Sequence, residues 1–168
     1  ASGAPITFID ARGTLNRDAR SARQTANSTL SPGEISSLLG IFEQNGNIYW
    51  INPSVIDPNT GRAWNGFGSD PFEGQAFFPA NPGETGNLPR TIVNSPKYFN
   101  FNAALLKNIS FTERSRLQLR MEVFNVLNNV NFLITAAQQL QNINSTTFGQ
   151  ITSAGAARTI QFGARFEF

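Results

Sequence analysis

The segment from residue 116 to residue 123 alternates strictly between polar and apolar side chains. The polar positions are Arg116, Gln118, Arg120 and Glu122, and the apolar positions are Leu117, Leu119, Met121 and Val123. Because side chains two residues apart in a strand share a face, the segment predicts a strand with one charged and one apolar face. Charges within the alternation indicate that the polar face meets water or a wet lumen rather than a dry core. We expect the side chains of this polar face to form ion pairs, with Arg120 and Glu122 each paired to a neighbour across the sheet.

Catalytic chemistry is restricted by the composition. The chain has no His and no Cys, so it lacks the usual general base, the commonest metal ligand and the thiolate nucleophile. An active site would need paired carboxylates or a Ser–Lys pair. Asp10 with Asp18, and Glu73 with Glu84, qualify by residue type alone, and no spacing supports them. We therefore expect a non-catalytic protein with no metal and no other cofactor.

Bulk properties exclude further classes. The net charge is +2 and the 13 Lys and Arg residues are scattered, which gives no basic stripe for nucleic acid. No apolar run approaches the roughly 18 residues of a membrane helix, and no signal peptide opens the sequence. The one Met is Met121, so we expect the chain to be a processed product or a piece of a longer protein.

Residues 1–97 read mainly as loop. Residues 6–9 are a short apolar run that could end a strand, and the arginine-rich stretch that follows favours a solvated loop over an anion site. Ser31-Pro32-Gly33-Glu34 is a capping box, which together with apolar residues at helical spacing predicts one short helix over residues 32–43. Asn45-Gly46 either ends that helix or forms a tight turn, and residues 48–51 resemble a short strand.

The segment from residue 52 to residue 96 is interrupted throughout by Pro and Gly and still carries several aromatic residues. Disordered linkers contain few aromatics. The composition therefore predicts an ordered, irregular loop that packs its own rings, including Trp64, Phe67 and Phe77. An aromatic platform for a ligand is the less favoured alternative.

Residues 98–126 predict a β-hairpin, with strands over 98–107 and 116–126 and a polar turn between them. A second polar connection, residues 127–157, contains a possible helical turn at 135–140. Residues 158–168 alternate again, with Ile160, Phe162, Ala164, Phe166 and Phe168 on one face. A strand of this length and pattern suits a membrane β-barrel, although the core strand of a soluble β-sandwich alternates in the same way.

The order of long loop, strand, short turn, strand, long loop and strand resembles the rhythm of outer-membrane barrels, which have short periplasmic turns and long outer loops. The turn at residues 112–115 would then be periplasmic, and Phe168 would lie at the same rim. We therefore predict an all-β fold of antiparallel barrel strands, three or four in number, with long irregular loops.

Residues 108–114, Asn-Ile-Ser-Phe-Thr-Glu-Arg, and residues 117–128, Leu-Gln-Leu-Arg-Met-Glu-Val-Phe-Asn-Val-Leu-Asn, resemble the C-terminal barrel region of TonB-dependent outer-membrane receptors. The Oar-like group, which bears a carboxypeptidase-regulatory domain and is common in acidobacteria, is the most similar type. Residues 148–151 and 157–162 are similar to its approach to the final strand, and residues 9–16 and 51–54 to its outer loops. The resemblance implies transport across the outer membrane of a Gram-negative bacterium, with a siderophore, glycan or peptide as ligand.

The resemblance also implies roles for individual residues. Lumen-facing positions would be Arg116, Gln118, Arg120 and Glu122, and lipid-facing or buried positions would be Leu117, Leu119, Met121, Val123, Ile160, Phe162 and Phe166. The signal read by the barrel-insertion machinery of such proteins would be Gln161, Gly163, Phe166 and Phe168.

Family members also carry an N-terminal plug, a TonB-contacting segment and about 22 strands. Three strands, or four with a stub at residues 6–9, cannot close a barrel, and open edges are not tolerated in lipid. The edges would be paired by the remainder of the receptor barrel and plug or by other copies of the same chain. Two alternatives therefore stay open: a cleaved fragment that assembles through strand edges into an extracellular filament, and a soluble β-sandwich binding module of the lectin kind.

Overall fold

The computed structural model describes residues 3, 5–11, 24–81, 84–134 and 142–168. These residues separate into two compact units. The sheet unit contains Lys97–Phe132 and Ala154–Phe168, and the loop unit contains Ser2–Pro96 and Leu133–Ser153. The arginine-rich stretch at 12–23 and the possible helical turn at 135–140 lie outside the described residues.

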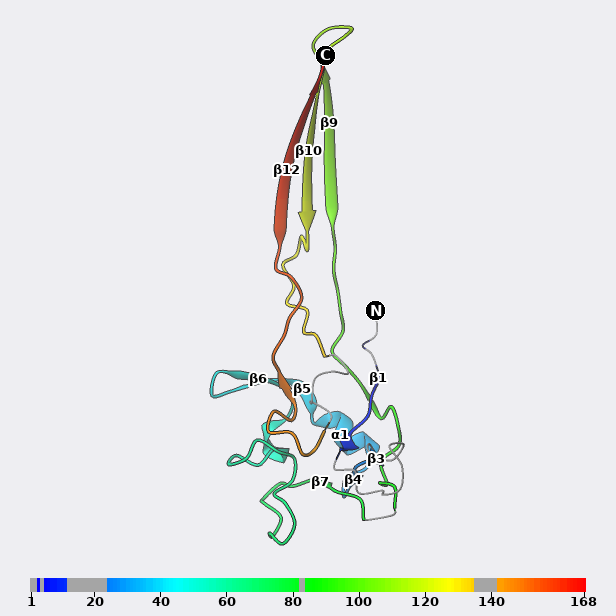
Figure 1. Ribbon diagram of the computed structural model, residues 1–168, viewed down its shortest axis with the longest axis vertical. Helices are drawn as coiled ribbons and strands as arrows, with labels where there is room; N and C mark the ends of the chain where they lie inside the picture. Colours follow the sequence, from blue (N-terminus) through cyan, green and yellow to red (C-terminus); the bar gives the residue numbers. More distant parts are fainter. Residues whose placement is uncertain (1–2, 4, 12–23, 82–83, 135–141) are drawn as a thin grey trace. The chain divides into compact units, whose positions relative to one another are not determined.

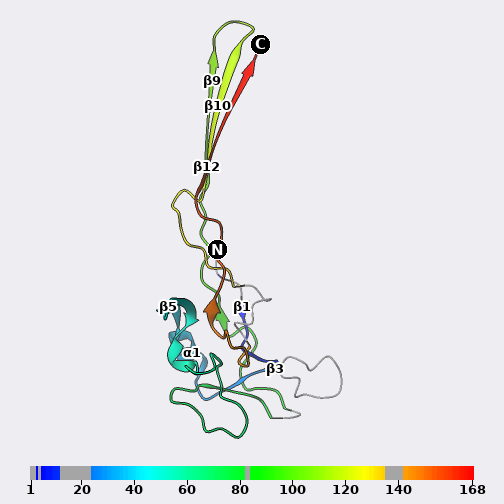
Figure 2. The same ribbon diagram turned by 60° about the vertical axis from the view of Figure 1, so that its left-hand side comes forward.

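The sheet unit is built on three antiparallel strands in the order β12-β10-β9. The strands are β9 (Ala103–Ser110), β10 (Arg116–Phe124) and β12 (Thr159–Glu167). They lie side by side in both views (Figures 1 and 2). The ladder between β10 and β12 is continuous from Arg116 opposite Glu167 to Phe124 opposite Thr159. Antiparallel strands predicted from the alternation are thereby confirmed.

A short polar turn joins β9 to β10. The backbone N–H of Phe111 donates to the carbonyl of Ser115 at 3.0 Å, and the N–H of Ser115 donates to the Thr112 hydroxyl at 3.0 Å. The predicted strand at 98–107 was placed too early, because residues 108–110 belong to β9 and not to the turn. The turn is tight, so Ser110 must stand directly opposite Arg116.

The described residues of the loop unit form four small antiparallel sheets. Three are two-residue ladders: β1 (Pro5–Ile6) with β8 (Val93–Asn94), β2 (Ile9–Asp10) with β3 (Gln24–Thr25), and β4 (Asn27–Ser28) with β7 (Phe77–Phe78). The fourth has the order β11-β6-β5, from β5 (Leu39–Gln44), β6 (Asn47–Ile51) and β11 (Gln150–Ile151). The expected strand stub at residues 6–9 therefore contributes to two short ladders and not to the sheet of β9, β10 and β12.

Helix α1 (Pro32–Ser37) begins at the predicted capping box. The Ser31 hydroxyl accepts from the N–H of Glu34, and the Glu34 carboxylate accepts from the N–H of Ser31 at 2.8 Å. Hydrogen bonds first from the Ser31 side chain and then from its backbone hold the pKa of Glu34 below its usual value. The predicted end at residue 43 is wrong, because residues 39–44 form strand β5.

The change from helix to strand follows from the turn after β5. Asn45 and Gly46 have φ values of 53° and 75°, the left-handed pair that closes a two-residue hairpin. This turn returns the chain so that Phe42 pairs with Tyr49 and Gln44 with Asn47. The ladder pairs Leu39 and residues 42–44 of β5 with β6, with an irregularity between Leu39 and Phe42. A helix that continued to residue 43 could not form this ladder.

The core of the loop unit contains a cluster of aromatic rings among aliphatic side chains. Phe8, Phe77 and Phe148 are fully buried, with ring centroids 4.8 Å apart for Phe8 and Phe77 and 5.6 Å apart for Phe77 and Phe148. Trp50 stacks on Phe8 at 6.3 Å. The predicted packing of rings from the 52–96 segment is confirmed for Phe77 and for the buried Trp64, while Phe67 stays exposed and meets Trp64 edge-on.

A short 3-10 helix, η2 (Pro53–Val55), follows β6 and is capped by the Asn52 side chain. In the part of the chain that the structure describes, no helix is long and apolar enough to cross a membrane.

Candidate functional site: a sheet with one apolar and one charged face

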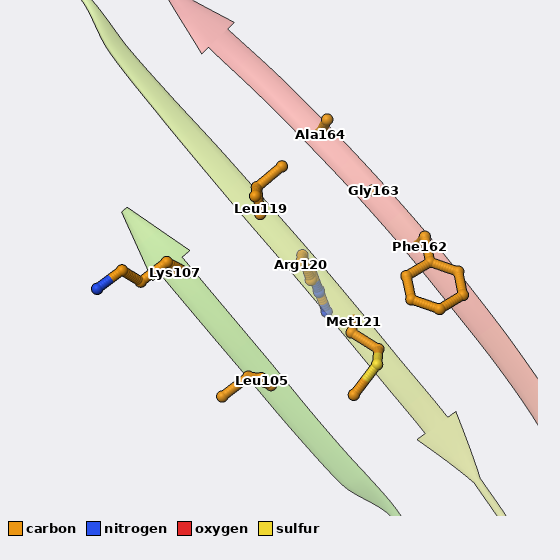
Figure 3. Close-up of a pocket in the computed structure, with 8 residues that line it drawn as sticks. All are labelled: Leu105, Lys107, Leu119, Arg120, Met121, Phe162, Gly163 and Ala164. Atoms are coloured by element: carbon orange, nitrogen blue, oxygen red, sulfur yellow. The ribbon is translucent and has the colours of Figure 1, made fainter. Parts of the chain in front are cut away.

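The register of the sheet unit divides its side chains between two faces. Met121 stands opposite Leu105 on β9 and Phe162 on β12, and directly opposed residues share a face. The apolar face consists of Ala103, Leu105, Lys107, Ile109, Leu117, Leu119, Met121, Val123, Ile160, Phe162, Ala164 and Phe166. Figure 3 shows part of this face, with Arg120 behind the ribbon. All positions predicted to be lipid-facing or buried lie on it.

The apolar face is exposed within the described chain. Phe162 is 80% exposed, Leu105 is 62% exposed and Phe166 is 55% exposed. A contiguous apolar surface of this kind on a protein marks contact with a membrane or with another protein.

The opposite face carries the predicted lumen-facing residues and a chain of ion pairs. Arg116 lies 3.5 Å from Glu167, and Arg165 lies 3.0 Å from the same carboxylate. The Gln118 amide donates to Asn108 on β9 at 3.1 Å. These side chains are largely solvated, so each pair stabilises the sheet by about 1 kcal/mol or less. Their arrangement makes a wetted, charged surface.

Arg120 and Glu122 depart from the expected pairing across the sheet. Arg120 donates to Glu122 of its own strand, two residues along. The prediction was wrong because both cross-strand partners of each residue are uncharged. Arg120 stands between Leu106 and Gly163, and Glu122 between Ala104 and Gln161.

Aromatic rings mark the end of the sheet nearest the β9–β10 turn. Phe166 lies 6.4 Å from Phe111 and 6.2 Å from Phe168, measured between ring centroids. Phe101 precedes β9, ten positions before Phe111. Ten extended residues span about 33 Å, or about 25 Å along the normal at a tilt near 40°. This is the height of the apolar band between the aromatic girdles of an outer-membrane barrel.

The four predicted signal residues divide between the two faces. Gln161 and Gly163 belong to the charged face, opposite Glu122 and Arg120, whereas Phe166 and Phe168 contribute to the aromatic cluster. A Cβ atom added to Gly163 would lie 3.9 Å from the Cβ of Arg120, an ordinary contact. Packing within this sheet therefore does not by itself require glycine at position 163.

A hollow of about 420 Å³ lies on the apolar face, where Ala164 provides little side-chain volume. Lys107 lines this hollow, which sequence reasoning missed (Figure 3). The signal was present, because Lys107 lies two residues beyond Leu105 and so continues the apolar side of the alternation.

The carboxylates considered for catalysis form no paired site among the described residues. Asp10 is buried and accepts a hydrogen bond from Asn144 at 2.8 Å, and Asp18 lies outside the described residues. Glu84 accepts from Asn81 at 2.9 Å, and no interaction joins it to Glu73. Within the same residues, no group of three or more acidic side chains is placed to hold a metal.

Comparison with known proteins identifies the family. No curated protein and no solved structure is significantly similar to the chain. The family model described as outer membrane beta barrel domain matches residues 1–161. The match spans both the sheet unit and the loop unit, and it agrees with antiparallel strands that carry one exposed apolar face and one charged face. The chain therefore belongs to the outer membrane beta barrel domain family.

Proposed function

We propose that the chain is the wall and outer-loop segment of a TonB-dependent outer-membrane receptor of the Oar-like type. The observation that carries this proposal is the sheet of β9, β10 and β12, which has one mainly apolar face and one face that carries the ion pairs. Family membership supports the outer-membrane barrel. The resemblance of residues 108–114 and 117–128 supports the finer assignment to a TonB-dependent receptor of a Gram-negative bacterium.

In this proposal the apolar face meets lipid and the charged face lines the lumen. Phe111, Phe166 and Phe168 form part of the periplasmic aromatic girdle, and the turn at 111–115 is periplasmic. Arg116, Arg120 and Glu122 then contact water inside the barrel, where their charges are solvated. Outer-membrane lipid is the partner of the opposite face.

The loop unit would lie outside the cell and contact ligand. Its aromatic core and its small ladders hold irregular segments in one arrangement without long strands. Such a unit offers loops for binding a siderophore, a glycan or a peptide, with no catalytic step and no cofactor. Gln161, Gly163, Phe166 and Phe168 would be read by the barrel-insertion machinery.

The test is performed on the full-length polypeptide that contains this chain, purified from the outer membrane in mild detergent. We expect it to bind the purified periplasmic domain of TonB and to fold as a single-chain barrel. A folded barrel that does not bind TonB would overturn the receptor assignment and leave the barrel family unchanged.

The free edges of β9 and β12 favour one alternative. Neither edge is paired within the sheet of the described residues, so copies of the chain could add strands to one another in an extracellular filament. Electron microscopy of the native material separates the two ideas. Discrete membrane particles would exclude the filament. Unbranched fibres would exclude the idea that the chain acts only as part of a receptor barrel.

A further inference from the structure

We propose that Lys107 and the hollow beside it bind one glycerophospholipid of the periplasmic leaflet, with an acyl chain in the hollow and the phosphate on the lysine ammonium. This inference rests on the proposed lipid-facing role of the apolar face. It adds a specific ligand site to a surface that otherwise needs only bulk lipid.

Lys107 carries the only charge on the apolar face of β9, β10 and β12. Its opposite residue on β10 is Leu119, and Ala164 lies beyond Leu119 on β12. In the described part of the chain, its ammonium group makes no ion pair and no hydrogen bond. An ionisable side chain that faces lipid is costly and is normally matched by an anionic partner.

The hollow next to Lys107 is almost wholly apolar. Its volume is about 420 Å³, and its side-chain walls include Leu105, Leu119, Met121 and Phe162. Figure 3 shows these side chains on the three strands, with Ala164 next to Leu119 across the β10–β12 ladder. A shallow depression with a mainly apolar lining fits a hydrocarbon chain, and the charged side chains among its lining residues are Lys107 and, behind the strand, Arg120.

The depth of Lys107 selects the leaflet. Lys107 lies four positions before Phe111 and six positions after Phe101, so it is closer to the girdle at the β9–β10 turn. Four extended residues span about 13 Å, less along the normal of a tilted strand. The long lysine stem can carry its ammonium toward that girdle, where phosphate groups begin. With the turn periplasmic, that leaflet consists of glycerophospholipid.

The experiment uses the full-length protein, purified from outer membranes and titrated with phosphatidylglycerol while native mass spectrometry counts bound lipid. We expect one phospholipid to remain at activation energies that remove the others. Lys107→Leu removes the charge, and Ala164→Phe fills the hollow while retaining the charge. Each should weaken this binding at least about tenfold, as expected for the loss of a charge-assisted contact or of its apolar complement.

Lys107→Arg should keep the lipid, and Lys97→Leu, which removes the other lysine of the sheet unit, should have no effect. Compact migration in unheated detergent gels shows that each variant is folded. Equal lipid binding by Lys107→Leu and the parent, absence of a retained lipid, or retention of lipopolysaccharide instead would each overturn the proposal.

A spin label at Phe162→Cys separates failure of this site from failure of the proposed function. A label that reports a lipid environment while no phospholipid is retained refutes the Lys107 site alone. A label that reports water refutes the lipid-facing assignment itself, and with it the barrel-wall role on which the site depends.

Discussion

Asp57 combines burial with a full set of hydrogen bonds. Its carboxylate accepts from the N–H of Asn59 at 2.9 Å and from the Thr60 hydroxyl at 2.7 Å, and the residue is 4% exposed. Burial alone would raise the pKa of Asp57, but the hydrogen bonds from Asn59 and Thr60 outweigh it and the pKa lies below its usual 3.8. The turn at residues 57–61 is therefore built around an ionised carboxylate.

The lowered pKa of Asp57 predicts the sign of a pH effect. The unfolded chain binds the proton more readily than the folded one, so the ionised group stabilises the fold above pH 3.8. This contribution should disappear as the pH falls through the lower, folded pKa. Tryptophan fluorescence of Trp50 and Trp64 during denaturant unfolding, repeated from pH 6 down to about pH 2, measures the effect.

Asp57→Asn removes the titration and should flatten this part of the pH profile, and Asp57→Ala should also lower the free energy of unfolding by about 1–3 kcal/mol. Asp70→Asn is the control, because Asp70 is exposed and its carboxylate accepts no hydrogen bond among the described residues. A profile unchanged by Asp57→Asn would contradict the assigned role.

Gly61 closes the same turn with a φ of 71°. A Cβ atom at this position would lie 2.2 Å from the carbonyl oxygen of Thr146. Gly61→Ala therefore combines a left-handed backbone with a backbone clash and should destabilise the loop unit by about 1–3 kcal/mol. Gly33→Ala is the matched control: it lies in α1 with open space around it and should be neutral or slightly stabilising. Thermal unfolding of the two variants makes the comparison.

At the scale of elements, the two-residue alternation predicted the strands and their faces correctly, whereas the helical spacing of apolar residues overestimated the length of the helix. The side-chain faces of β10 and β12 follow directly from their sequences, because a strand has only two faces and no other solution fits the pattern. Residues 39–44 carry apolar side chains that fit either period, and the left-handed Asn45-Gly46 turn decides for a hairpin. The spacing of residues 39–44 alone could not decide between helix and strand, because the strand is stabilised by pairing with β6.

Pairing partners were less predictable than faces. The Arg120–Glu122 contact depends on which β9 and β12 residues stand opposite, and the tight turn after Ser110 fixes only the register with β9. The small ladders of the loop unit join segments as distant as β1 and β8. Two-residue ladders leave no periodicity in a sequence, so only the folded chain reveals them.

Two adjacent positions on β12 test the assignment of its faces. Phe162 lies on the apolar face and Gln161 on the charged face. A lysine facing the middle of the lipid costs about 2–4 kcal/mol, whereas a lysine facing the lumen is solvated. Phe162→Lys should therefore reduce the yield of inserted barrel in outer membranes, and Gln161→Lys should leave it near the parental level. Equal yields from both variants would reject a lipid-facing Phe162.

At the scale of the whole molecule, the three-stranded sheet has two edges to satisfy. The strand order β12-β10-β9 leaves one side of β9 and one side of β12 unpaired within that sheet. In lipid such edges must be paired, and roughly eight strands are needed to close a barrel. If the apolar face meets lipid, as proposed, the sheet unit must pair with further strands, either of the same receptor or of other copies.

The absence of Cys from the sequence allows these partners to be distinguished by single labels. Leu106→Cys places a thiol on β9, Gln161→Cys places one on β12, and Gln118→Cys places one on the central β10. When the 168-residue chain is produced alone and held in detergent solution, a short bismaleimide should cross-link copies through the two edge positions. The central position should link copies poorly, because β10 is paired on both sides.

The same three variants in the full-length protein, within native membranes, should give no copy-to-copy product, because other strands of the barrel occupy both edges. Cross-links between copies at both edge positions but not at Gln118 would instead support the self-assembling filament. Failure of the isolated chain to cross-link at any position would contradict the premise that its strand edges seek partners, and would require the apolar face to be covered in some way other than by barrel closure.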